Sequence, residues 1–209
     1  MTLPGRGLYA IADTATIGGD IDSAVAAAIA GGAVIVQYRD KTSDSARRLR
    51  EATQLSQTCH RQGAILIVND DVELAAAAAA DGVHLGVDDM DIAQARSRLP
   101  GGAIVGVSCY DSLARARQAA HDGADYIAFG SFFPSPTKPR AVRAPIGLLA
   151  EARDAVSIPL VAIGGITPQN APSLIGAGAD FLAVISGVFG ASDIRGAARA
   201  YSGCFRPVR

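Results

Sequence analysis

The fold is decided by the stretch Gly178-Ala179-Asp180-Phe181-Leu182-Ala183-Val184-Ile185-Ser186-Gly187, which runs from a helix end through a strand to a turn. A glycine suited to end a helix is followed by a short apolar run and then by polar residues. The same junction, at which a helix ends and a strand begins, is predicted at Gly123-Ala124-Asp125. Residues 81–83 and 31–33 show the pattern less clearly. The apolar run is almost continuously hydrophobic, which is typical of a parallel strand buried on both faces.

Similar runs occur along the whole chain, separated by alanine-rich stretches. We expect strands at residues 8–12, 33–38, 64–68, 82–85, 103–107, 125–129, 160–163 and 181–185. The expected helix starts are Asp20 or Asp22, Ser43 or Asp44, Asp111, and Asp193. Eight strand–helix units in 209 residues leave about 26 residues for each unit, which suffices with short loops.

These units predict an α/β fold with a single domain, a (β/α)8 TIM barrel over residues 1–209. The structural alternative is an open, doubly wound sheet, which also has parallel strands covered by helices. Eight strands rather than five or six favour the barrel. In a barrel, the residues that follow each strand meet on one face, where barrel enzymes place their chemistry.

Composition narrows the class of partner. Of the residues, 49% are hydrophobic. The chain has 19 basic and 20 acidic residues, which gives a net charge of −1. This balance favours neither nucleic acid nor a membrane as partner, so we expect small molecules. The three cysteines form no pairing pattern, and the first residues lack a signal-peptide pattern, so we expect a cytoplasmic protein.

A fork of hydrogen-bond donors follows the second predicted strand. Gln37, Arg39 and Lys41 lie within five residues, in the segment Gln37-Tyr38-Arg39-Asp40-Lys41. Cations at a helix start oppose the helix dipole, so a purely structural role suits them poorly. Their spacing favours recognition of a diphosphate.

Carboxylates follow the third and fourth strands. Asn69 and Asp70 taken alone are ordinary turn or cap residues, and so is Asp89. Because Asp70 and Asp89 end adjacent strands, their carboxylates are expected to converge on one Mg2+ ion, which takes one or two protein carboxylates. His84 lies within an apolar run and is expected to be a core or supporting residue.

Two further segments suggest anion binding. Ser135, Pro136, Thr137 and Lys138 form a proline-stiffened loop after the sixth strand, which is either a rigid surface loop or a clamp over an anion. Gly165, Ile185 and Ser186 follow the last two strands, where many barrels bind phosphate.

The ordered set of motifs resembles the thiamine-phosphate synthase family over residues 8 to about 201. Each motif is weak by itself, whereas the set in this order is specific. The motifs are Gln37-Tyr38-Arg39-Asp40-Lys41, Asn69-Asp70, Asp81-Gly82-Val83-His84-Leu85-Gly86, Asp89-Met90, Gly106-Val107-Ser108, Pro134-Ser135-Pro136-Thr137-Lys138, Gly164-Gly165-Ile166 and Ile185-Ser186.

The resemblance implies a transferase that joins a pyrimidine diphosphate to a thiazole phosphate by a dissociative, Mg2+-assisted reaction. The implied catalytic residues are Arg39, Lys41, Ser108 and Lys138. By the same resemblance, the pyrimidine diphosphate contacts Gln37, Tyr38, Arg39, Asp40, Lys41, Asn69, Ser108 and Lys138. The thiazole phosphate contacts Ser135, Pro136, Thr137, Gly165, Ile185 and Ser186, and one Mg2+ ion binds Asp70 and Asp89.

Four positions depart from the family pattern, namely Tyr38, Asp71, Val87 and Ser135. Asp71 adds a negative charge beside the expected metal site. The alternatives are a thiazole tautomerase-like isomerase, another phosphate-binding barrel such as a sugar-phosphate isomerase, and a non-catalytic thiamine-precursor binding protein. The sequence leaves the oligomeric state open and is compatible with a homo-oligomer.

Overall fold

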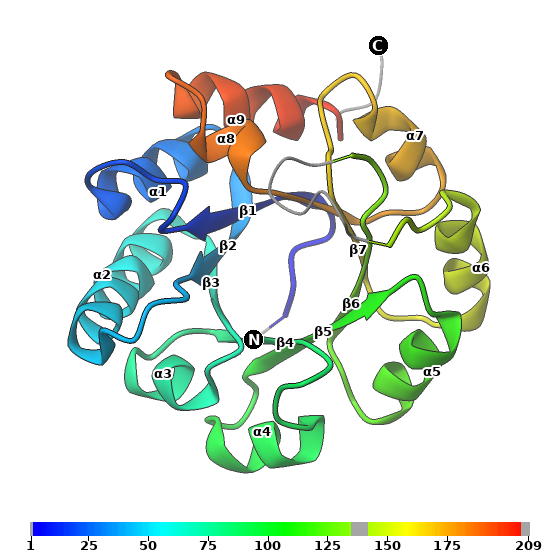
Figure 1. Cartoon of the computed structure of the whole chain (residues 1–209), viewed down its shortest axis with the longest axis horizontal. Helices are drawn as coiled ribbons and strands as arrows, with labels where there is room; N and C mark the ends of the chain where they lie inside the picture. Colours follow the sequence, from blue (N-terminus) through cyan, green and yellow to red (C-terminus); the bar gives the residue numbers. More distant parts are fainter. Residues whose placement is uncertain (1, 135–141, 206–209) are drawn as a thin grey trace.

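Eight parallel strands close into a barrel in sequence order (Figure 1). The computed structural model describes residues 2–134 and 142–205. The strands are β1 (Gly7–Asp13), β2 (Ala33–Arg39), β3 (Ile65–Asn69), β4 (Gly82–Leu85), β5 (Ile104–Tyr110), β6 (Tyr126–Phe129), β7 (Leu160–Ile163) and β8 (Phe181–Val184). β8 pairs with β1, which completes the closure and confirms the predicted (β/α)8 barrel.

Helices surround the barrel on its outer side (Figure 1). They are α1 (Ile21–Ala30), α2 (Ser45–Gln62), α3 (Val72–Ala77), α4 (Ile92–Arg98), α5 (Leu113–His121), α6 (Gly147–Ala155), α7 (Ala171–Gly176), α8 (Ser186–Phe189) and α9 (Ile194–Gly203). No helix within the described ranges is both long and apolar enough to cross a membrane.

Three of the four helix starts that were expected from the sequence are confirmed. Asp20, Asp44 and Asp193 cap α1, α2 and α9 by accepting backbone N–H bonds. The expected start at Asp111 was wrong by one residue, because the Ser112 hydroxyl accepts the Arg115 amide and so caps α5. A serine oxygen there satisfies the same exposed amide that an aspartate would.

The core has two layers that follow strand alternation. Side chains at every second position fill the barrel interior, with Tyr9, Ile35, Ile67, Tyr126 and Phe181 among the most buried. The intervening positions pack outward against the helices. Leu3 packs against the inner layer, and the N-terminal segment runs across the barrel in Figure 1. This segment therefore covers the end of the barrel at which the strands begin.

An aspartate joint recurs where strands begin, on the face opposite the carboxyl ends. Asp81, Asp125 and Asp180 immediately precede β4, β6 and β8. Each carboxylate accepts the amide of a residue at the start of the preceding strand, and the donors are Leu66, Val105 and Leu160. Asp125 and Asp180 also pair with arginines of the flanking helices. These bonds fix the strand starts without using any residue of the opposite face.

Candidate active site

Two cations and two carboxylates meet above β1, β2 and β3. The Arg39 guanidinium forms an ion pair with Asp13, at the end of β1, and the Lys41 ammonium pairs with Asp70, just after β3. The Asp13 side chain is only 5% exposed and also accepts the Ala15 amide, so its position is well constrained. The structure thus places Arg39, Lys41 and Asp70 at the carboxyl ends of adjacent strands, where the strand-end rule predicted them.

Strand alternation separates the other members of the Gln37–Lys41 segment. Gln37 is buried and donates from Nε2 to the Tyr9 hydroxyl inside the barrel at 2.8 Å. Tyr38 points outward, where its hydroxyl donates to Glu51 of α2 at 2.7 Å. This placement gives no support to the expected substrate contact of Tyr38, because neighbouring residues in a strand face opposite sides.

Asp40 lies at the turn after β2, and its carboxylate is bound by other side chains of the protein. Its buried carboxylate accepts hydrogen bonds from Thr14 and Thr42 and pairs with Arg47 at 2.6 Å. Burial alone would raise the pKa of Asp40, but these hydrogen bonds and the Arg47 charge lower it below its ordinary value. The structure therefore gives Asp40 a role in holding the loop, and it does not direct this carboxylate at a ligand.

The two carboxylates expected to hold Mg2+ lie close together. Asp70 adopts a left-handed backbone conformation (φ 63°), and its amide donates to the His84 carbonyl of β4. Asp89 accepts the Gly86 amide at 2.6 Å. Burial, followed by hydrogen bonding and repulsion from Asp70, raises the pKa of Asp89. Among the described residues, no group of three or more His, Cys, Asp or Glu side chains is placed to hold a metal.

Asp71, the charge that departs from the family pattern, is neutralised within the protein. Its carboxylate accepts the Leu74 amide and so caps α3. The same side chain lies 2.9 Å from the Arg48 guanidinium of α2. Asp71 therefore acts as a helix cap with its own counter-ion.

Ser108 lies at an inward-facing position near the end of β5. Its hydroxyl contacts His84 Nε2 at 2.9 Å, and His84 Nδ1 contacts the buried Tyr126 hydroxyl at 2.9 Å. His84 thus has the supporting place expected from its apolar surroundings. Asn69 ends β3 at the same inward parity as Ile65 and Ile67, so it also faces the barrel mouth.

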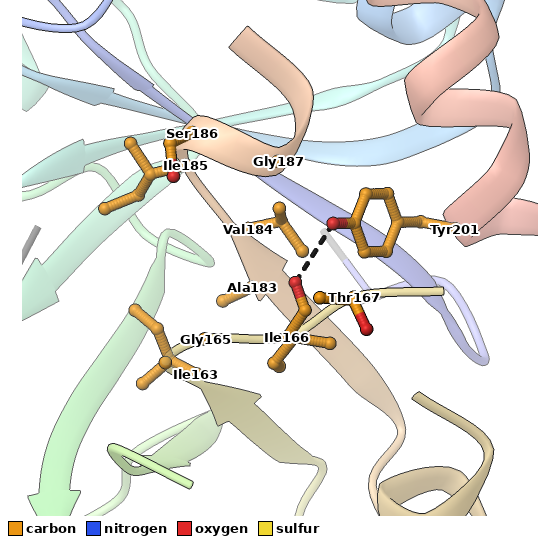
Figure 2. A pocket seen from close by; sticks show the side chains of 11 residues that line it. Ile163, Gly165, Ile166, Thr167, Ala183, Val184, Ile185, Ser186, Gly187 and Tyr201 are labelled. Atoms are coloured by element: carbon orange, nitrogen blue, oxygen red, sulfur yellow. Dashed lines mark hydrogen bonds between the residues drawn. The ribbon is translucent and has the colours of Figure 1, made fainter. Parts of the chain in front are cut away.

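A cavity of about 190 Å³ opens between the ends of β7 and β8. Its lining includes Gly164, Gly165, Ile185, Ser186 and Gly187 (Figure 2). Ser186 and Gly187 begin α8, and the first amides of a helix have no acceptor within the helix. Backbone amides and a hydroxyl therefore border this cavity, which suits a phosphate group.

Atoms packed closely around this cavity leave no room for a side chain at Gly165. Gly165 has a φ of 61°, and a Cβ atom there would lie 2.2 Å from the Pro134 carbonyl oxygen. On the other side, the Tyr201 hydroxyl donates to the Ile166 carbonyl at 3.0 Å, as the dashed line in Figure 2 marks. Ser135, Pro136, Thr137 and Lys138, the expected clamp, lie outside the described residues.

Three residues of the site were not anticipated from the sequence. Asp13 follows the first strand, and the strand-end rule applied there would have found it. Tyr9 and Tyr126 have the appearance of core residues, because only their hydroxyl groups carry polarity. Their connection to Gln37 and Ser108 depends on cross-barrel packing, for which the sequence has no local signal.

Comparison with known proteins identifies the family of the chain. The family model described as thiamine monophosphate synthase matches residues 8–188. The chain is 54% identical to the thiamine-phosphate synthase of Nitrosococcus oceani over 197 residues, which is 94% of this chain and 91% of the relative. It is also 54% identical to that of an Azoarcus species over 96% of this chain and 97% of the relative.

Solved structures give the same result. Thiamine phosphate pyrophosphorylase from Pyrococcus furiosus superposes with a TM-score of 0.84 at 35% identity, covering 96% of this chain and 95% of that one. A 3-hexulose-6-phosphate synthase from Salmonella typhimurium, with a TM-score of 0.69 at 21% identity, shares the fold alone. The chain therefore belongs to the thiamine monophosphate synthase family and is an enzyme of thiamine biosynthesis.

Proposed function

We propose that the protein condenses 4-amino-2-methyl-5-(diphosphooxymethyl)pyrimidine with 4-methyl-5-(2-phosphooxyethyl)thiazole to give thiamine phosphate and diphosphate. The observation that carries this proposal is that two regions suited to anions lie on one face. Arg39 and Lys41 lie above β2, and the glycine-lined cavity lies between β7 and β8. A diphosphate suits the first region and a monophosphate suits the second.

The first region suits a leaving group that gains negative charge. As the carbon–oxygen bond to diphosphate breaks, its electron pair stays on the diphosphate oxygen, and preplaced cations stabilise that charge. Arg39 and Lys41 supply two cations from the described residues, and we assign Lys138 the same task from the family resemblance. Their present partners, Asp13 and Asp70, keep these side chains near the mouth before a ligand arrives.

The Asp70–Asp89 pair suits one Mg2+ ion. Two adjacent carboxylates repel each other, as the raised pKa of Asp89 reflects, and a divalent cation between them would relieve that repulsion. When bound, Mg2+ would add positive charge beside the diphosphate oxygens. The protein's part is to hold Asp89 through the Gly86 amide and Asp70 through its constrained backbone.

The second region suits the phosphate of the thiazole partner. Gly165, Ser186 and Gly187 offer backbone amides, and the Ser186 hydroxyl adds a side-chain donor. We assign Ser135, Pro136 and Thr137 to the same phosphate and thiazole by resemblance. In the dissociative reaction that we propose, diphosphate leaves first with the electron pair of the carbon–oxygen bond. The thiazole nitrogen then donates its electron pair to the pyrimidine methylene cation, so the reaction needs no protein nucleophile.

A direct assay of product formation tests the proposal. Purified protein is incubated with both substrates and Mg2+, and thiamine phosphate and diphosphate are measured by chromatography. We expect equal amounts of both products, no product with EDTA, and no thiamine phosphate without the thiazole phosphate. Folded protein that forms no thiamine phosphate would overturn the proposal. Isomerisation of the thiazole phosphate alone would instead identify the tautomerase-like activity.

A further inference from the structure

Four hydrogen bonds cross the barrel interior and join two residues of the proposed pyrimidine site. Gln37 Nε2 donates to the Tyr9 hydroxyl at 2.8 Å, and the two tyrosine hydroxyls lie 2.8 Å apart. The Tyr126 hydroxyl lies 2.9 Å from His84 Nδ1, and His84 Nε2 lies 2.9 Å from the Ser108 hydroxyl. We call this set of five side chains the cross-barrel chain.

The two tyrosines at its centre are fully enclosed. Tyr126 is 0% exposed and Tyr9 is 1% exposed, and burial raises the pKa of both phenols. Each therefore keeps its hydroxyl proton at neutral pH and donates one hydrogen bond. Gly106 makes this packing possible, because a Cβ atom there would lie 1.9 Å from the Tyr126 ring.

Counting protons gives the chain a direction. The Gln37 amide nitrogen has only protons to give, so Tyr9 accepts at this end and must donate its own proton to Tyr126. Tyr126 then donates to His84 Nδ1, which leaves the imidazole proton on Nε2. Any other order leaves a buried hydroxyl proton without an acceptor among the described residues, which carries a large desolvation penalty.

We infer that the cross-barrel chain holds His84 as the Nε2–H tautomer and thereby makes Ser108 a hydrogen-bond donor toward the barrel mouth. His84 Nε2 donates to the Ser108 oxygen, so the Ser108 proton is free of His84. Tyr9, Tyr126 and His84 are positioning residues that act through Gln37 and Ser108. Resting on the proposed function, the inference specifies that the substrate atom beside Ser108 is an acceptor, such as a pyrimidine ring nitrogen.

The donor at position 37 sets the direction of the chain. If the side chain at position 37 accepted rather than donated, every bond would reverse, and Ser108 would donate to His84 instead. The Gln37→Glu substitution creates this condition once the new carboxyl group is ionised, because a carboxylate only accepts. Burial raises the pKa of a carboxyl group at this position, so the spectra are recorded over a pH series that extends above it. The tautomer of His84 should then invert although residue 37 acts on it only through the hydrogen bond to Tyr9.

Nitrogen NMR measures the tautomer directly. The protein has three histidines, so 15N-histidine labelling with two-bond proton–nitrogen correlation gives a simple spectrum, and His84→Gln identifies the signal of interest. We expect the Nε2–H tautomer in the wild type and the Nδ1–H tautomer in Gln37→Glu. In the double variant Gln37→Glu with Tyr9→Phe, the chain is cut and the wild-type tautomer should return.

Three results would overturn the inference, namely an Nδ1–H tautomer in the wild type, a tautomer that stays unchanged over the whole pH series in Gln37→Glu although the new carboxyl group ionises, or inversion that persists in the double variant. Should Gln37→Glu fail to fold, Tyr126→Phe removes the donor to His84 Nδ1, and both tautomers should then appear. A single Nε2–H tautomer in Tyr126→Phe would equally contradict it. The spectra need no substrate, so failure of the proposed function would leave this test intact.

Discussion

Asp13 and Arg39 form an ion pair at the neighbouring ends of β1 and β2, with the carboxylate 5% and the guanidinium 21% exposed. The pair fixes one end of a long side chain that would otherwise sample many rotamers. Arg39 is thereby directed over the barrel mouth before any ligand binds. We therefore expect Asp13 to position this cation for a ligand.

Asp13→Asn should lower kcat/KM for the pyrimidine diphosphate by about 10- to 100-fold. A hydrogen bond to a charged group is worth about 1.5–3 kcal/mol, and its loss frees Arg39. Steady-state kinetics measure the change. Asp180→Asn is the matched control, because Asp180 pairs with Arg153 on the opposite face, and kcat/KM per folded molecule should be unchanged. Equal kcat/KM in Asp13→Asn and the wild type would contradict the role of Asp13.

Asp89→Asn should separate stability from metal binding. Because the folded pKa of Asp89 is raised, its ionisation at neutral pH opposes folding, so the neutral amide should keep or increase the free energy of unfolding. Stabilisation by added Mg2+ should disappear. Thermal unfolding with and without Mg2+ measures both effects, and Asp88→Asn, at the exposed neighbouring position, should behave as the wild type. A full Mg2+ response in Asp89→Asn would show that the ion binds elsewhere.

Mg2+ affinity should depend on pH through the same carboxyl group. The raised pKa means that a proton competes with the metal at higher pH than at an ordinary aspartate, so affinity falls as pH is lowered through the pKa of Asp89. Below that point the decline should approach about tenfold per pH unit. Calorimetric titration of the free protein with Mg2+ at several pH values provides the data, and a flat profile would be inconsistent with Asp89 as a ligand.

Gly106→Ala should destabilise the barrel by about 1–3 kcal/mol, the usual cost of overfilling a packed core. The added Cβ atom would lie 1.9 Å from Tyr126 Cζ, so the ring must move and its hydroxyl must leave Tyr9 or His84. Denaturant unfolding measures the loss. Gly101→Ala serves as the control, since nothing lies within 4 Å of a Cβ atom at that position. A stability equal to that of the control would mean that Tyr126 can shift freely.

Gly165→Ala should raise the KM for the thiazole phosphate by at least about tenfold and change the KM for the pyrimidine diphosphate much less. The new Cβ atom would meet the Pro134 carbonyl oxygen at 2.2 Å in a left-handed conformation, which displaces the loop that borders the cavity. Gly63→Ala has a similar φ of 73° with open space around it, so it separates backbone strain from closure of the cavity. Equal effects of the two substitutions would remove the case for a phosphate site here.

The sequence predicted the architecture well because buried parallel strands have a strong local pattern. All eight expected strands are present, and those at 82–85 and 160–163 have the expected bounds. The strand-end rule also brought Arg39, Asp70 and Asp89 to one face. Tyr38 shows why one role should not be assigned to every residue of a motif. Alternation along β2 places its side chain on the opposite side of the strand from Gln37 and Arg39.

Contacts across the barrel were beyond the reach of the sequence. Whether Tyr126 meets Tyr9 and His84 depends on the register of strands far apart in the chain and on space left by Gly106. Likewise, the partner of Asp71 is Arg48, on a helix 23 positions earlier. Such pairs follow from packing, which single-sequence patterns do not encode.

The aspartate joints before β4, β6 and β8 also divide the barrel into repeated pairs of strands. Each joint connects a strand to its immediate predecessor, so it closes a loop of only 15 to 20 residues. Short closures favour rapid, local assembly. The pair β1–β2 has Gly32 at the corresponding place. Three of the four strand pairs thus carry a carboxylate that links their starting ends, whereas β1 joins the ring through its backbone pairing with β2 and β8.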